Sequence, residues 1–109
     1  MSYQVKMTYN AISQLRDIVE YISVFLGEGD IAKHWSDRIK KAIFSLDQMP
    51  FRYPLVNEEP WRSEGIHKMV VENFIVYYWV SLDTSTVWIS AIVYGRRDQI
   101  NALRKIKKE

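Results

Sequence analysis

The sequence predicts an α+β domain in which an N-terminal strand and a two-helix antiparallel hairpin precede a mainly antiparallel four-stranded sheet. Three observations support this fold class. A short segment of alternating side chains comes before two segments with helical periodicity. Three apolar runs rich in β-branched and aromatic residues follow, separated by two short polar breaks of the kind that join consecutive hairpins. Helices that are grouped ahead of the hairpins, rather than alternating with strands, favour α+β.

The composition is that of one globular domain. The chain has 109 residues, of which 48% are hydrophobic and 26% charged, so residues 1–109 are expected to form a single core. Without cysteine, disulfides and cysteine-ligated zinc are excluded. No apolar run approaches the roughly 18 residues that a membrane span needs, and the N-terminal residues do not resemble a secretory signal. We therefore expect a cytoplasmic protein with no membrane partner.

The first half of the chain is predicted to be strand, helix, helix. Residues 3–7 alternate as in a half-buried strand. Thr8 is expected to cap the first helix, Gly27 and Gly29 to stop it, and Asp30 to start the second. The first apolar stripe consists of Ala11, Ile12, Leu15, Ile18, Val19, Ile22, Phe25 and Leu26. The second consists of Ile31, Trp35, Ile39, Ala42, Ile43 and Leu46. The two helices are expected to cover one face of the sheet.

The second half is predicted to be loop, three strands and a short C-terminal helix. Pro50 ends the second helix, and residues 50–60 contain three prolines and no clean period. Strands are expected over residues 66–71, 74–80 and 86–94. Alternation along the last strand assigns Val87, Ile89, Ala91 and Val93 to the face with the helices, and Trp88, Ser90, Ile92 and Tyr94 to the opposite face. That opposite face is expected to stay open and to hold the functional site.

Positive charge is concentrated at the C-terminal end. Residues 96–109 carry six basic and two acidic side chains, a net charge of +4, whereas residues 1–95 carry −2. Such a cluster raises the local concentration of anionic partners, although a solvated helix face explains the same pattern.

Basic and aromatic residues at the strand ends are the candidates for function, because guanidinium groups and an aromatic hydroxyl suit an anionic partner. The candidates are Arg62, His67, Lys68, Tyr94, Arg96 and Arg97. Each has a structural alternative. Arg62 can pair with neighbouring glutamates, Lys68 can be an ordinary cross-strand charge, and His67 can be a satisfied neutral histidine. Neither histidine stands at a metal-ligand spacing, so no metal or cofactor is expected.

Five segments together resemble the RelE/ParE toxin superfamily: the opening YQVKMTYNAISQLRDIVEYI, the MPFRYPLV loop, the WRSEGIHKM entry, the NFIVYYWV strand and the VYGRRDQ ending. The resemblance covers nearly the whole chain. It implies the α+β fold described above and the toxin half of a bacterial type II toxin–antitoxin module. The implied partner is a small antitoxin protein.

The resemblance implies two activities. RelE-like toxins enter the ribosome and cut mRNA without a metal, leaving 2′,3′-cyclic phosphate ends. In that case Arg62 and Arg96 bind phosphate, Tyr94 positions the nucleotide, Lys68 or His67 transfers a proton, and Arg97 helps to bind substrate. ParE-like toxins instead bind DNA gyrase and need no catalytic group.

The RelE-like ribonuclease is the first expectation. A gyrase inhibitor or an inactive antitoxin-binding module is the alternative. Glu58 and Glu59 occupy the loop in which the RelE pattern has clustered lysines, and the GRRD ending is closer to the ParE pattern.

Overall fold

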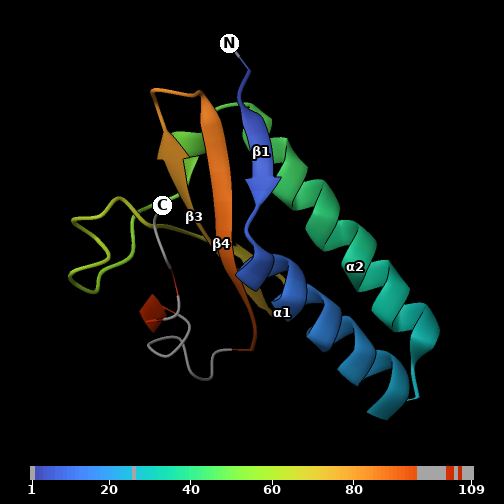
Figure 1. Cartoon of the computed structure of the whole chain (residues 1–109). Coiled ribbons are helices and arrows are strands. Elements are labelled where there is room, and N and C mark those ends of the chain that lie inside the picture. Colours follow the sequence, from blue (N-terminus) through green and yellow to red (C-terminus); the bar gives the residue numbers. More distant parts are fainter. Residues whose placement is uncertain (1, 26, 96–102, 105, 107–109) are drawn as a thin grey trace.

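The predicted fold class is confirmed: two helices pack on a four-stranded mixed sheet (Figure 1). The computed structural model describes residues 2–25, 27–95, 103, 104 and 106. Its elements are β1 (Gln4–Met7), α1 (Tyr9–Glu20), α2 (Gly29–Phe44), β2 (His67–Val71), β3 (Phe74–Ser81) and β4 (Thr86–Tyr94). A π-helical turn (Tyr21–Phe25) extends α1, and two 3-10 turns (Ser45–Asp47 and Pro50–Arg52) follow α2. Most of the expected C-terminal helix lies outside the described residues. Within that segment, Leu103 and Arg104 are described and are helical.

The sheet has the order β1-β4-β3-β2. β1 runs parallel to β4, and the other two pairs are antiparallel. The three late strands agree with the predicted ranges to within one residue. The polar breaks are the hairpin turns, and each uses a residue in the left-handed region, Glu72 at φ 53° and Ser85 at φ 49°. The sequence therefore predicted the strand order along the chain and the position of each turn.

The helix starts and the apolar stripes follow the predictions except at Gly29, at Ile31 and at Ile12, which is 45% exposed. Thr8 caps α1, its hydroxyl accepting a hydrogen bond from the Ala11 amide at 3.2 Å. α2 begins one residue earlier than predicted, at Gly29. Ile31 is 40% exposed instead of buried, and Ala32 takes its place, because the stripe through Ile39 and Ile43 continues at spacings of three and four. Leu26 and the side chain of Phe25 lie outside the described part.

Within the described part of the chain, neither helix has the length and apolarity needed to cross a bilayer.

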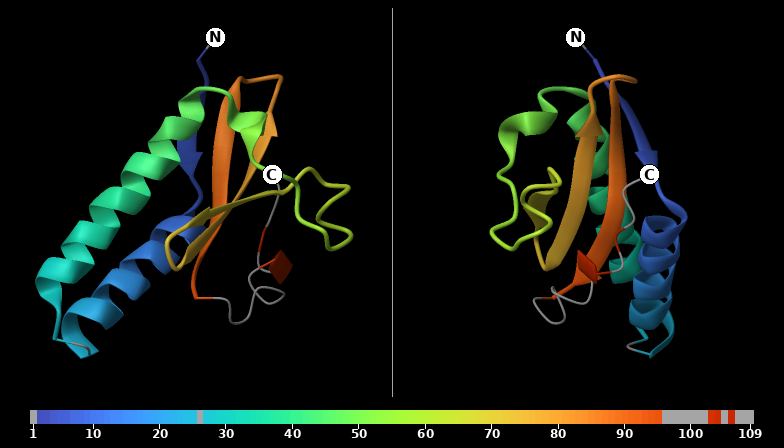
Figure 2. Two further views of the ribbon diagram at one scale, coloured as in Figure 1. Left: turned by 180° about the vertical axis from the view of Figure 1, so that it is seen from behind. Right: turned by 60° about the vertical axis from the view of Figure 1, so that its left-hand side comes forward.

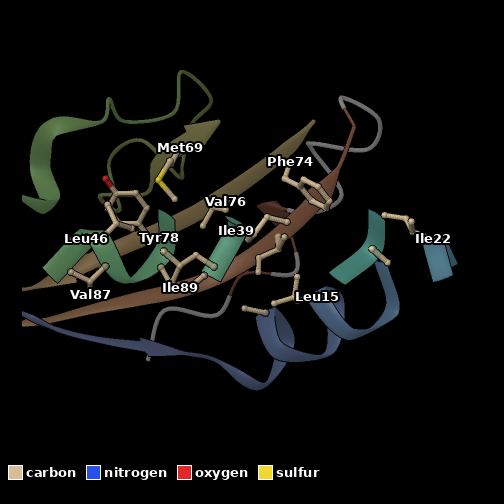
Figure 3. Packing of buried hydrophobic residues seen from close by; sticks show 14 residues of the cluster. Leu15, Ile22, Ile39, Leu46, Met69, Phe74, Val76, Tyr78, Val87 and Ile89 are labelled. Carbon is tan, nitrogen blue, oxygen red and sulfur yellow. The ribbon is translucent and has the colours of Figure 1, made fainter. Parts of the chain in front are cut away.

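Apolar side chains pack on both faces of the sheet. The main core lies between the sheet and the two helices (Figure 3). Its buried members are Ala11, Leu15, Ile22, Ala32, Ile39, Ile43, Leu46, Met69, Phe74, Val76, Tyr78, Val87, Ile89 and Ile92. A second cluster on the opposite face contains Val56, Ile66, Ile75, Tyr77, Ala91 and Leu103. The expectation of an open face is therefore wrong, because the segment between α2 and β2 folds over that face (Figure 2).

A β-bulge in β4 changes which side chains face the helices. Tyr78 pairs with Ile89 and Tyr77 with Ala91, so Ser90 is an extra residue on β4. Before the bulge, Val87 and Ile89 belong to the main core, as predicted. After it the alternation is inverted. Ile92 and Tyr94 pack against the main core, whereas Ala91 and Val93 pack with the second cluster. The predicted facing of these four residues is therefore wrong.

Tyr77 and Tyr78 make folding stability sensitive to alkaline pH. Both side chains are fully buried, and the Tyr78 hydroxyl donates to the Pro50 carbonyl oxygen at 2.7 Å. Burial raises the pKa of each phenol from 10.0 to about 12, with the Glu58 charge contributing at Tyr77. Because the folded state then holds these protons more tightly than the unfolded chain, their contribution is fully present below pH 10 and declines as pH rises towards 12.

We expect Tyr78→Phe to lower the free energy of unfolding at pH 7 by about 1–2 kcal/mol, because the buried Pro50 carbonyl loses its donor. The same variant should lose less stability between pH 10 and pH 11.5 than the wild-type chain, since one of the two buried phenols is gone. Urea unfolding at a series of pH values measures both effects. Parallel pH profiles for the two proteins would contradict this assignment.

Candidate functional site

The candidate residues come from both sides of the sheet. Lys68 lies on β2 opposite Tyr77, on the side of the second cluster. Arg62 lies in the turn before β2 on the same side, where its Nη1 donates to the Val56 carbonyl oxygen at 3.2 Å. Tyr94 lies on the helix side. Arg96 and Arg97 lie outside the described residues. The described candidates therefore do not gather on one surface.

Tyr94 is part of an aromatic group beneath α2. Its ring centroid lies 6.1 Å from that of Trp35 on α2 and 5.2 Å from that of Phe74 on β3. Trp35 and Phe74 in turn make an edge-to-face contact at 5.9 Å. The Ser90 bulge is the reason that Tyr94 faces the helices instead of the opposite side. The ring is consequently engaged in packing at the end of the main core.

His67 is enclosed by neighbouring groups and is only 7% exposed. Its Nδ1 lies 2.8 Å from the Tyr53 carbonyl oxygen. One ring face stacks on Tyr78 with centroids 5.0 Å apart, and Phe51 contacts the ring edge-to-face at 5.7 Å. This is the environment of a structural histidine, one of the two alternatives left open by the sequence. The ring joins the 50–53 turn to β2.

Lys68 lies between two surface pockets with mixed charge. One, of about 510 Å³, is shared with Glu72, Asn73 and Gly95. The other, of about 430 Å³, is shared with Glu58 and the backbone around it. Each pocket is therefore lined by one carboxylate as well as by Lys68, so neither is purely cationic, and the Glu72 carboxylate is itself paired with Arg38 Nη1 at 2.8 Å. Among the described residues, no group of three or more His, Asp or Glu side chains is arranged to hold a metal ion.

Arg62 has a similar local environment. Its neighbour Glu59 accepts hydrogen bonds from the Ser63 amide at 2.8 Å and the Ser63 hydroxyl at 2.9 Å. These bonds, and then the Arg62 charge, lower the pKa of Glu59 below its ordinary value. Glu59 is therefore ionised at neutral pH beside Arg62. Arg62 is exposed, and the surface around it also carries the negative charge of Glu59.

A groove between α1 and α2 forms an apolar depression on the described part of the surface. It has a volume of about 530 Å³. Its lining consists of Met7, Ile12, Leu15, Arg16, Val19, Glu20, Ser23, Val24, Ser36 and Lys40. Ile12 is 45% exposed and Val24 66% exposed. If the helix packed only against the sheet, such exposed positions would be expected to carry polar side chains. Arg16 and Lys40 add two cations to this lining and Glu20 adds one carboxylate, so the groove carries a small net positive charge and suits an apolar segment with acidic flanks.

The sequence indicated part of this surface. The sequence predicts Ile12 and Val19 in the apolar stripe of the first helix, and that stripe is wider than contact with the sheet requires. The groove itself depends on how the two helices diverge, which the sequence pattern does not give. Figure 1 shows α1 and α2 side by side, joined by the short turn at their far ends.

Comparisons with known proteins give consistent results. The model of the family described as "ParE toxin of type II toxin-antitoxin system, parDE" matches residues 5–99. The chromosomal ParDE toxin–antitoxin system from P. aeruginosa contains a chain with a TM-score of 0.70 and 19% identity, covering 87% of this chain and 98% of that one.

Two other solved structures have the same fold. The RelBE2 toxin–antitoxin complex from Mycobacterium tuberculosis gives a TM-score of 0.66 at 16% identity, covering 86% of this chain and 92% of that one. A mutant of the E. coli toxin RelE in the free state gives 0.64 at 12% identity, covering 98% and 100%. These identities show the fold alone. No curated protein matches the sequence significantly.

The aromatic contacts of Tyr94 lead to a prediction about stability. Tyr94→Ala should lower the free energy of unfolding by about 2–3 kcal/mol, because it removes a half-buried ring packed on Trp35 and Phe74. Tyr94→Phe keeps the ring and should change stability by less than about 0.5 kcal/mol. Chemical denaturation of the two variants measures the difference. If Tyr94→Ala were as stable as Tyr94→Phe, the ring would not be part of the core.

Proposed function

The chain belongs to the ParE toxin family of type II toxin–antitoxin systems, within the RelE/ParE superfamily, and we propose that it disables its target by binding rather than by cleaving RNA. The proposed target is DNA gyrase, which the superfamily resemblance implies for ParE-like members. The observation that carries the proposal is the separation of Tyr94 and Lys68 on opposite sides of the sheet.

Metal-independent RNA cleavage makes geometric demands that this arrangement does not favour. A group that takes the 2′-proton, a cation for the phosphate and a group that holds the nucleotide must all reach one phosphodiester. Here Tyr94 packs on Trp35, His67 is enclosed, and Lys68 shares its pockets with Glu58 and Glu72. A toxin that acts by binding needs a complementary surface and no such constellation.

A RelE-like ribonuclease is the second candidate, and one observation favours it. Lys68 and Gly95 line the same pocket, and Arg96 follows Gly95 in the sequence. A lysine and an arginine that act on the same phosphate would provide a proton-transfer group and a permanent cation. This version of the site uses Lys68 and Arg96 and does not need Tyr94.

Inducing the chain without its antitoxin distinguishes the two candidates. We expect growth arrest with DNA damage, and inhibition of gyrase supercoiling by the purified protein, while primer extension finds no new mRNA 5′ ends. Lys68→Ala should inhibit growth about as strongly as the wild-type chain. New mRNA ends that disappear in Lys68→Ala would favour the ribonuclease instead. Normal growth on induction would contradict both candidates and favour an inactive antitoxin-binding module.

We propose that the groove between α1 and α2 receives an apolar segment of the antitoxin. A protein antitoxin is the partner that membership of this family implies. The exposed apolar side chains of Ile12 and Val24 offer anchor sites, and Arg16 and Lys40 can pair with acidic residues of the bound segment. Burying such anchors stabilises a complex in proportion to the apolar area removed from water.

Val24→Glu should weaken binding of the antitoxin of the same module at least about tenfold, because it sets a carboxylate in the apolar groove. Val70→Glu is the matched control, since Val70 is 57% exposed on β2 and does not line the groove. Calorimetric titration of both purified variants gives the two affinities. Equal affinities for Val24→Glu and Val70→Glu would contradict the assignment of the groove.

A further inference from the structure

β4 loses its strand neighbour on one side halfway along its length. β1 pairs with β4 from Gln4 opposite Thr86 to Met7 opposite Ile89. The Thr8 amide then donates to the Ile89 carbonyl oxygen at 2.9 Å, and the chain turns into α1. From Ser90 onward, the backbone of β4 on that side is no longer next to a strand. Buried backbone groups without partners would cost stability, so these groups need other partners.

Three side chains, one from the N-cap residue Thr8 and two from the first half of α1, supply them. The Ser90 carbonyl oxygen accepts from the Thr8 hydroxyl at 3.3 Å and from Asn10 Nδ2 at 3.0 Å. The Ile92 amide donates to Gln14 Oε1 at 2.8 Å. Ser90 is the extra residue of the bulge, and Ile92 is the first residue beyond it that faces the helices. The side chains of α1 therefore continue, across the bulge, the hydrogen bonding that β1 begins.

We propose that Asn10 and Gln14 are positioning residues that hold the bulge of β4. By fixing the bulge they determine which face Tyr94 occupies and where β4 ends, at Tyr94, before Gly95 and the basic C-terminal segment. Without these bonds β4 could lose the extra residue from its register, since a one-residue slip moves each later side chain to the other face. Trp35 and Phe74 would then lose Tyr94 as a packing partner.

The functional part of this inference rests on the proposed function, because growth inhibition is one of its readouts. The C-terminal fourteen residues carry a net charge of +4, and their attachment point is set by the end of β4. Asn10 and Gln14 do not line the groove between α1 and α2. Their effect on toxicity is therefore expected to act through β4 and not through the groove.

Four substitutions test the proposal. Gln14→Met removes the acceptor at nearly constant length, and Gln14→Glu keeps an acceptor oxygen. Asn10→Asp removes the Nδ2 donor and sets a carboxylate against the Ser90 carbonyl. Asp17→Met is the control, an exposed position on the same helix. Amide hydrogen exchange of Ile92 and the NOE between the Trp35 and Tyr94 rings report on the bulge, and thermal unfolding reports on the whole fold.

In Gln14→Met we expect exchange at Ile92 to rise about tenfold relative to the wild-type chain, the factor that corresponds to loss of one hydrogen bond. Gln14→Met and Asn10→Asp should also weaken the Trp35–Tyr94 NOE and inhibit growth less. Gln14→Glu and Asp17→Met should match the wild-type chain in exchange at Ile92, in the Trp35–Tyr94 NOE and in growth inhibition.

Two results would overturn the proposal: wild-type exchange at Ile92 in Gln14→Met, or equal acceleration throughout β3 and β4, which would indicate global destabilisation. Loss of growth inhibition in Gln14→Glu with normal exchange would also overturn the functional part. If the wild-type chain does not inhibit growth, the proposed function fails, whereas the exchange and NOE measurements still decide whether these two residues hold the bulge.

Discussion

The need to satisfy the backbone of β4 beyond its pairing with β1 is the constraint on which the rest of the structure depends. β1 is only four residues long, whereas β4 has nine. Beyond Ile89, the start of α1 takes over through Thr8, Asn10 and Gln14. This arrangement places the bulge at Ser90, and the bulge inverts the facing of the last four residues of β4. The position of Tyr94 follows from these few hydrogen bonds, and it decides that Tyr94 and Lys68 do not share one surface.

Both faces of the sheet are covered, and this limits where a site can lie. The helices cover one face and the segment containing Val56 and Ile66 covers part of the other. Concave surface remains at the edge near Lys68 and between the two helices. The first is lined by Lys68 together with Glu58 and Glu72, whereas the second has an apolar floor with Arg16, Lys40 and Glu20 in its lining. Such a distribution suits recognition of another protein better than chemistry on a phosphate.

The sequence predicted the elements well and the side-chain facing less well, for physical reasons. Strand ranges, hairpin turns and the Thr8 cap depend on local residue chemistry, and these predictions are confirmed. The facing of Ile92 and Tyr94 depends on an inserted residue in the pairing of β3 with β4, which alternation along a single strand cannot reveal. Asn10 and Gln14, four residues apart on one helical face, were a signal that could have indicated a polar contact behind the helix. Their partner could not be identified without the parallel pairing of β1 and β4.

The two surfaces that involve α1 are separated by helical geometry. Asn10 and Gln14 lie on one side of the helix, and Ile12 and Arg16, two residues further along in each case, are turned by about 200°. The first pair bonds to β4 and the second lines the groove. A partner in the groove therefore contacts the side of α1 that does not hold the bulge. Contacts in the groove and control of the end of β4 are separate properties of one rigid helix, and substitutions two residues apart can change either one alone.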